Sequence, residues 1–137
     1  MADLKISQLT AVTTPLTLTE QLPVVQSGTT KKATGQELLT GVIVTESGTS
    51  RTLSSSDNGK VIYCTSGSAV TITCATGLPV GFNCTIIQAG AGKVTVAAGA
   101  ATLNSYSSLF STVGQYAVIS LISPVANTFI AAGNLGV

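Results

Sequence analysis

The stretch that decides the fold runs from Asn58 to Val96 and reads NGKVIYCTSGSAVTITCATGLPVGFNCTIIQAGAGKVTV. Short apolar runs alternate in it with turns that contain glycine and serine, which are typical turn residues. Within each run every second residue is apolar, as in Val70, Ile72 and Cys74, and this period of two indicates half-buried strands. Four such strands in close succession predict an antiparallel meander.

The sequence around this stretch extends the meander to a whole domain. Tyr116–Ile122 is apolar throughout and predicts a central strand, and Asn127–Ala132 predicts the last strand. Leu103–Phe110 is expected to form a surface loop with apolar anchors. We therefore expect an all-β protein in which residues 46–137 form an antiparallel β-sandwich of seven or eight strands.

Residues 1–45 differ from the rest and predict an extended N-terminal arm. Leu22–Gln26 and Thr29–Ala33 are two short strands joined by a Ser27-Gly28 turn. Thr34 and Glu37 have the spacing of a capping box, which predicts one short helix that ends near Gly41. So short a segment buries too little surface to fold alone, so we expect it to lie on another surface.

Charge is scarce and unevenly placed. Charged residues make up 8% of the chain, against roughly 25% in ordinary soluble domains, and the net charge is +1. Every acidic residue lies at or before Asp57, and Lys93 is the one charged residue from Val61 onward. This pattern predicts burial of part of the surface in a homo-oligomer, with a hydroxyl-coated monomer as the alternative. It gives no basis for nucleic-acid binding.

The side-chain inventory argues against an enzyme. The chain has no histidine, which excludes Ser-His-Asp and Cys-His arrangements within it. The five acidic residues lie outside the strands of the meander. We expect no cofactor and no catalytic residue. The uncharged segment from Tyr116 to Val137 contains polar residues and Pro124, so two strands explain it better than a membrane-spanning helix.

Three cysteines, Cys64, Cys74 and Cys84, are spaced ten residues apart. Three thiols without histidine or a fourth cysteine do not complete a structural zinc site. Their apolar neighbours favour small core residues, with one disulfide as a weaker alternative and a metal site weaker still.

Two short motifs are better explained by structure than by chemistry. Gly90-Ala91-Gly92-Lys93 lacks the first glycine and the following Ser or Thr of a phosphate-binding loop, so we expect a hairpin turn. Asn83-Cys84-Thr85 has the form of a glycosylation sequon, but MADLKISQLT has no apolar core of a secretory signal. The sequon therefore supports no inference.

Two segments carry a family resemblance. KISQLTAVTT with LPVVQSGTTKKATGQELL resembles the N-terminal arms of virion proteins of tailed bacteriophages, namely head fibres, decoration proteins and some tail fibres. DNGKVIYC through GQYAVISLI resembles a β domain found in such proteins, including the turns LPVGFN and QAGAGKV and the segment LNSYSSLFSTVGQYA. The resemblance implies a non-catalytic structural protein, often trimeric, with the arm docked on the virion and the domain projecting outward.

On this resemblance we expect a capsid decoration, cement or head-fibre protein that is made in the bacterial cytoplasm and located on the virion surface. The major capsid protein or another virion protein would be its partner, beside further copies of the chain. No shaft repeats separate the arm from the β domain, which favours a part that sits on the capsid. The expected capsid contacts are the apolar and basic residues of the arm: Lys5, Ile6, Leu9, Leu22, Lys31 and Lys32.

Two alternatives stay open. One is a module that binds glycans of the host surface, for which Tyr106, with Asn104 beside it, is the best aromatic platform in a chain that lacks tryptophan. Tyr106 as an anchor of its loop or of a subunit contact is the competing interpretation. The other alternative is a tail-associated fibre or adaptor.

Overall fold

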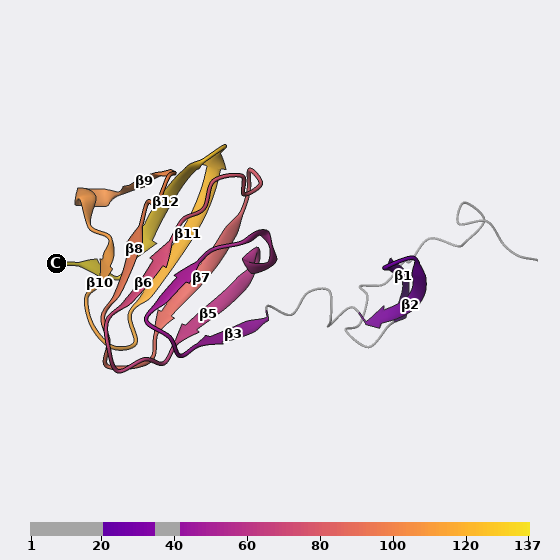
Figure 1. Cartoon of the computed structure of the whole chain (residues 1–137), viewed down its shortest axis with the longest axis horizontal. Helices are drawn as coiled ribbons and strands as arrows, with labels where there is room; N and C mark the ends of the chain where they lie inside the picture. Colours follow the sequence, from indigo (N-terminus) through magenta and orange to yellow (C-terminus); the bar gives the residue numbers. More distant parts are fainter. Residues whose placement is uncertain (1–20, 35–41) are drawn as a thin grey trace, which may run out of the picture. The chain divides into compact units, whose positions relative to one another are not determined.

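The computed structural model describes residues 21–34 and 42–137, and the chain divides into two units, Met1–Thr40 and Gly41–Val137 (Figure 1). The fold is all-β, because the described residues contain no helix longer than a single 3-10 turn. The capping-box helix expected after Thr34 lies outside the described residues.

The described part of the first unit is a hairpin. Strands β1 (Gln21–Gln26) and β2 (Thr29–Thr34) pair antiparallel along their whole length. Ser27 and Gly28 join them with φ values of 53° and 74°. Two successive residues with positive φ are the signature of the tight hairpin turn whose twist matches that of the strands. The short hairpin predicted here is therefore confirmed.

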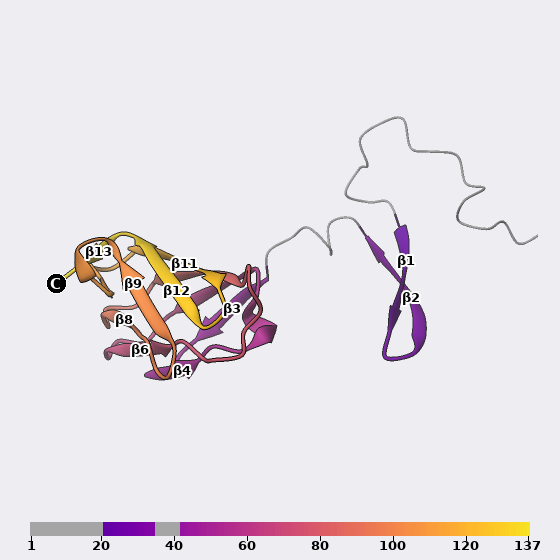
Figure 2. The same cartoon turned by 90° about the horizontal axis from the view of Figure 1, so that it is seen from above.

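The second unit, which we call the body, consists of two sheets that lie one over the other, with β11 and β12 in one and β4, β6 and β8 in the other (Figure 2). The first sheet has the strand order β3-β5-β7-β11-β12-β9 and the second β13-β10-β8-β6-β4. The strands of the body are β3 (Ile43–Glu46), β4 (Ser50–Thr52), β5 (Lys60–Cys64), β6 (Val70–Thr73), β7 (Asn83–Gln88), β8 (Val94–Ala97), β9 (Thr102–Ser105), β10 (Ser111–Thr112), β11 (Val118–Val125), β12 (Thr128–Gly133) and β13 (Leu135–Gly136).

The antiparallel meander is a wrong prediction. Consecutive strands from β3 to β8 lie in opposite sheets, so β5 pairs in parallel with β3 and β7, and β6 with β4 and β8. The chain thus winds through three stacked rungs, β3–β4, β5–β6 and β7–β8, in a solenoid-like arrangement. A period of two and a glycine turn occur in a hairpin and in a rung alike, because both bury one face of each strand.

The last third of the chain closes the stack with mixed pairings. Strand β11 pairs antiparallel with β7 and β12, and β9 pairs in parallel with β12. The central strand predicted over Tyr116–Ile122 corresponds to β11, which has a neighbour on each side. Leu103–Phe110, expected as a loop, contains most of β9 and a 3-10 turn, η3 (Tyr106–Ser108). After Glu46 the described residues hold ten strands, β4 to β13, more than the seven or eight predicted there, because several have only two or three residues.

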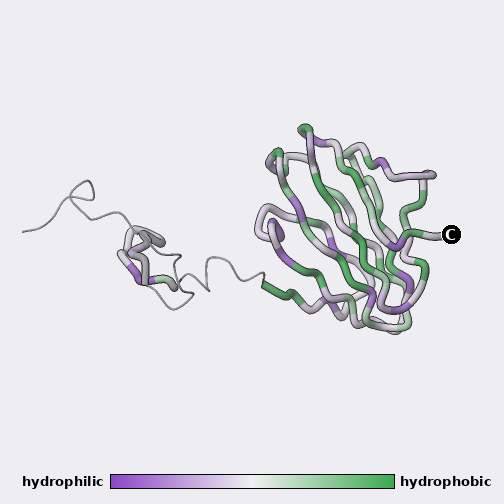
Figure 3. Tube along the Cα trace, turned by 180° about the vertical axis from the view of Figure 1, so that it is seen from behind, coloured by the Kyte–Doolittle hydropathy of each residue, from purple (hydrophilic) through white to green (hydrophobic). Residues whose placement is uncertain are grey.

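The core lies between the two sheets. Hydrophobic residues occur along the strands of the body, mixed with more polar ones (Figure 3), and those that face between the sheets are buried. The rings of Phe82 and Phe129 pack edge to face with centroids 6.2 Å apart. Cys64, Cys74 and Cys84 are buried in the same cluster as free thiols, which confirms that they are core residues.

The turns between β5 and β6 and between β7 and β8 stack on each other, and we call residues 65–68 and 89–92 the glycine corner. The N–H groups of Gly90 and Gly92 donate to the carbonyls of Cys64 and Ser66 at 2.9 and 3.0 Å. A Cβ on Gly92 would lie 1.8 Å from the Ser68 carbonyl oxygen. The turn is therefore a corner between sheets and not the expected hairpin turn, and its glycines permit backbone contact.

Candidate functional site

A pocket of about 270 Å³ lies at Tyr106, the residue that the sequence indicated as an aromatic platform. The tyrosine is 92% exposed, so its ring projects from the surface and is not packed into the core. Most of the pocket wall comes from the end of β12 and from β13. It is lined by Tyr106, Leu109, Ile130, Ala131, Ala132, Gly133 and Leu135.

An unusual local backbone places Tyr106 at this position. The chain leaves β9 at Ser105, and Ser107 and Ser108 then take φ values of 59° and 56°. Residues other than glycine adopt this left-handed region infrequently. The Ser105 hydroxyl donates to the Leu109 carbonyl at 2.5 Å, which ties the two ends of the short loop together.

Asn104 lies next to this pocket but does not line it. It sits on β9 directly opposite Ile130 of β12, on the exposed face of the six-stranded sheet. The lining side chains are apolar apart from Tyr106, so the pocket suits an apolar side chain or the face of a sugar ring. The Tyr106 hydroxyl is the one polar side-chain group among the residues that line the pocket.

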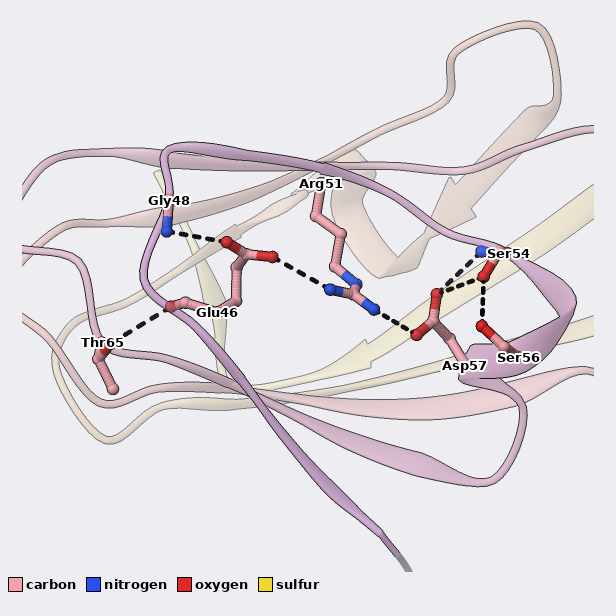
Figure 4. A network of polar contacts seen from close by, with 7 residues as sticks. All are labelled: Glu46, Gly48, Arg51, Ser54, Ser56, Asp57 and Thr65. Carbon is pink, nitrogen blue, oxygen red and sulfur yellow. Dashed lines mark hydrogen bonds and ion pairs between the residues drawn. The ribbon is translucent and has the colours of Figure 1, made fainter.

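A cluster of charged side chains lies at the first rung, and we call Glu46, Arg51 and Asp57 the ion-paired cluster (Figure 4). The Arg51 guanidinium donates to Glu46 Oε2 at 3.1 Å and to Asp57 Oδ1 at 2.6 Å. Glu46 and Arg51 pair in register with Cys64 and Ile72, two core residues, so both charges point inward from edge strands. Inward charges on an edge strand disfavour pairing with a further strand.

The other carboxylate oxygen of Asp57 caps the 3-10 turn η2 (Ser55–Asp57). It accepts hydrogen bonds from the Ser54 N–H at 2.9 Å and the Ser54 hydroxyl at 3.1 Å. Burial opposes ionisation of Asp57, but these bonds and Arg51 outweigh it, so its pKa lies below the usual range. An acid that stays ionised at neutral pH and is 1% exposed indicates a structural role for the cluster.

Sequence reasoning missed this cluster. Ser54-Ser55-Ser56-Asp57 has the Ser-x-x-acid spacing of a capping box, which could have indicated the bonds between Asp57 and Ser54. The pairing with Arg51 carried no comparable signal, because it depends on how the first rung folds back over the core.

The three thiols are poor nucleophiles in the folded chain. Burial raises the pKa of Cys64 and Cys74 to about 11 and that of Cys84 to about 12. Over residues 21–34 and 42–137 there is also no group of three acidic, histidine or cysteine residues that could hold a metal ion.

The expected capsid contacts lie in the first unit. Lys31 and Lys32 are exposed neighbours on β2, and the pleat directs adjacent side chains to opposite faces of the hairpin. The two lysines therefore do not form one cationic patch. Leu22 lies on β1, in register with Ala33. Lys5, Ile6 and Leu9 lie outside the described residues.

Comparison with known proteins assigns the chain to no family. No protein-family model matches the chain, and no curated protein matches it at a significant level. In the part of the chain that the structure describes, no helix is long and apolar enough to cross a membrane.

Proposed function

We propose that this chain is a non-enzymatic structural protein of a bacteriophage virion, a capsid decoration, cement or head-fibre protein attached through its N-terminal unit. The observation that carries the proposal is the division of the chain into two units, with a small strand hairpin in the first. The resemblance of both segments to phage virion proteins supplies the class of particle.

The strands of the hairpin would form the attachment contact. A two-stranded sheet is marginal by itself, and no further strand among the described residues pairs with β1 or β2. An edge of this hairpin can add to a sheet of the capsid, with main-chain hydrogen bonds for affinity and side chains for register. Leu22, Lys31 and Lys32 would lie at this contact, and the lysines would make it sensitive to salt.

Self-association would strengthen a weak contact. When several arms belong to one oligomer, binding of the first raises the effective concentration of the others at the particle surface. A homo-oligomer, for which the resemblance suggests a trimer, would thus hold firmly through contacts that are individually modest.

The first test is deletion of residues 1–40 with electron microscopy of particles that are incubated with the purified protein. We expect a folded body that no longer attaches, whereas the full chain labels the capsid. Attachment by the truncated chain would contradict the proposal. Labelling of the tail by the full chain would support the alternative of a tail fibre or adaptor.

A point variant tests the hairpin more sharply. Gly28 has a φ of 74°, which a β-branched residue adopts only with strain, so Gly28→Val should disrupt the turn and reduce attachment. Gly114→Val is the matched control, because Gly114 is not among the glycines with positive φ and a Cβ there meets no atom within 4 Å. Equal attachment of the two variants would exclude the hairpin from the contact.

The exposed ring of Tyr106 over its pocket favours glycan binding as a second candidate function. The readout is a glycan array with the full chain and with Tyr106→Ala. Binding that the substitution abolishes would support an adhesin. Binding that survives would exclude Tyr106 as the platform, and no binding would count against this candidate.

A further inference from the structure

The two outer faces of the body differ in chemistry. On the five-stranded sheet Ser50, Thr71, Thr95 and Ser111 lie in one row across four strands. Thr52, Thr73 and Ala97 form the next row. The Thr95 and Ser111 hydroxyls are 2.9 Å apart and bond to each other. Every residue in these rows except Ala97 carries a hydroxyl group that can hydrogen-bond with water, and we call this surface the hydroxyl face.

The outer face of the six-stranded sheet, which we call the apolar face, presents large hydrophobic side chains instead. Ile122 of β11 lies opposite Ile130 of β12, and the two side chains are 45% and 41% exposed. Register pairs extend this surface across the sheet from β3 to β12. Its large apolar members are Ile43, Val61, Tyr63, Ile87, Val118, Ile122 and Ile130.

The apolar face carries no charge on any of its six described strands. The polar side chains between the hydrophobic ones are neutral: Thr45, Asn83, Thr85, Thr102, Asn104, Ser120 and Thr128. A partner that brought charged groups onto this surface would lose their hydration and find no opposite charge. The occupant must therefore present an uncharged, partly apolar surface, and the same face of another copy has that character.

The size of the face is close to that of the smallest specific interfaces between proteins. Six strands about 4.8 Å apart, each about five residues long at about 3.3 Å per residue, cover about 29 by 17 Å, or about 480 Å². Two such faces together bury about 960 Å², close to the roughly 1,000 Å² at which specific interfaces begin. Two twisted sheets can pack in this way about 10 Å apart.

We propose that the apolar face of the six-stranded sheet is the self-association surface of this protein and packs against the same face of another copy. The hydroxyl face stays in solvent. This inference does not depend on attachment to a virion, because it concerns the body alone.

The test measures the molar mass of the full chain by light scattering over a range of concentrations. Packing between identical faces is two-fold symmetric, so we expect a dimer of twice 13.7 kDa for the wild type and not the trimer that the resemblance implies. Ile122→Lys should raise the dissociation constant about tenfold or more, because it places an unpaired charge in the interface. Thr71→Lys, an exposed position on β6 in the hydroxyl face, should leave the mass unchanged.

Ile130→Thr keeps a β-branched residue in β12 and serves if the lysine variant does not fold. It should also weaken self-association, by a smaller factor, with circular dichroism as the check of folding. A monomeric wild type would overturn the inference, and so would an oligomer that both substitutions on the apolar face leave intact. A loss of mass in Thr71→Lys equal to that in Ile122→Lys would overturn it as well.

Discussion

The glycine corner joins two neighbouring rungs and the ion-paired cluster joins the strands of the first rung to the turn that follows, and the two do so by opposite means. At the corner, Gly90 and Gly92 have no side chain, so one turn lies directly against the backbone of the next. At the cluster, the long side chain of Arg51 spans the space between Glu46 and Asp57. The corner depends on the absence of side-chain volume, and the cluster depends on the pairing of opposite charges.

This difference predicts two distinct sensitivities. The contacts of the corner are main-chain hydrogen bonds, so they depend on the size of the residues and not on pH. The contacts of the cluster depend on an ionised carboxylate and therefore on pH. Each region can be perturbed without changing a residue of the other.

The largest effect is expected for Gly92→Ala. The new Cβ would lie 1.8 Å from the Ser68 carbonyl oxygen, a backbone atom that cannot move without separating two rungs. We expect the free energy of unfolding to fall by about 3 kcal/mol or more, measured by urea denaturation. Gly67→Ala is the control within the same corner, because a Cβ there meets nothing within 4 Å. Similar losses in both variants would refute the steric explanation.

A smaller loss is expected for Asp57→Asn, which removes the charge but keeps the shape. Arg51 and the Ser54 N–H would lose a charged acceptor, at a cost of about 2 kcal/mol at pH 7. The pKa of Asp57 is lower in the folded chain than its unfolded value of about 3.9. The contribution of ionised Asp57 to stability is therefore complete above about pH 3.9.

That contribution is lost as the pH falls through the folded pKa, where Asp57 becomes protonated. Between pH 7 and pH 2 the free energy of unfolding should therefore fall less for Asp57→Asn than for the wild type. Denaturation curves recorded at each pH measure this difference. Gly92→Ala should keep the pH dependence of the wild type at lower overall stability. If Asp57→Asn kept the full acid sensitivity, the ion-paired cluster would not be its source.

The smallest effect on the free energy of unfolding is expected for labelling of the thiols. Their reaction rate reports how often the rungs open. Since burial raises the pKa of Cys64 to about 11, a thiol reagent at pH 8 should label it about a hundredfold more slowly in the folded than in the unfolded chain. Gly92→Ala should speed this labelling more than Asp57→Asn does, because the Gly90 N–H bonds to the Cys64 carbonyl. Equal labelling rates in all three proteins would show that the corner does not control access.

Local patterns in the chain predicted the strands well and their partners poorly. The alternation of Val70, Ile72 and Cys74 correctly identified buried positions, and Ser27-Gly28 correctly identified a hairpin. Gly90-Ala91-Gly92 was equally compatible with a hairpin and with a corner. Pairing depends on whether the next strand returns beside the last or crosses to the other sheet, and turn residues alone do not distinguish these paths.

The candidate site shows the same division. Tyr106 was identified from residue type, and the structure adds the pocket that β12 and β13 form around it. The lack of charge after Val61 predicts that part of the surface is apolar. It does not locate the apolar face, because the residues of that face come from separate strands.

Composition and period-two patterning by themselves determined that this protein is rich in strands, poor in charge and buries its cysteines, since these properties depend on neighbours along the chain. The tertiary structure alone decided that the strands stack in parallel rungs, that Arg51 meets Asp57, and that one sheet faces outward with apolar side chains and the other with hydroxyls. These features arise from contacts between residues far apart in sequence, and backbone geometry in three dimensions selects them.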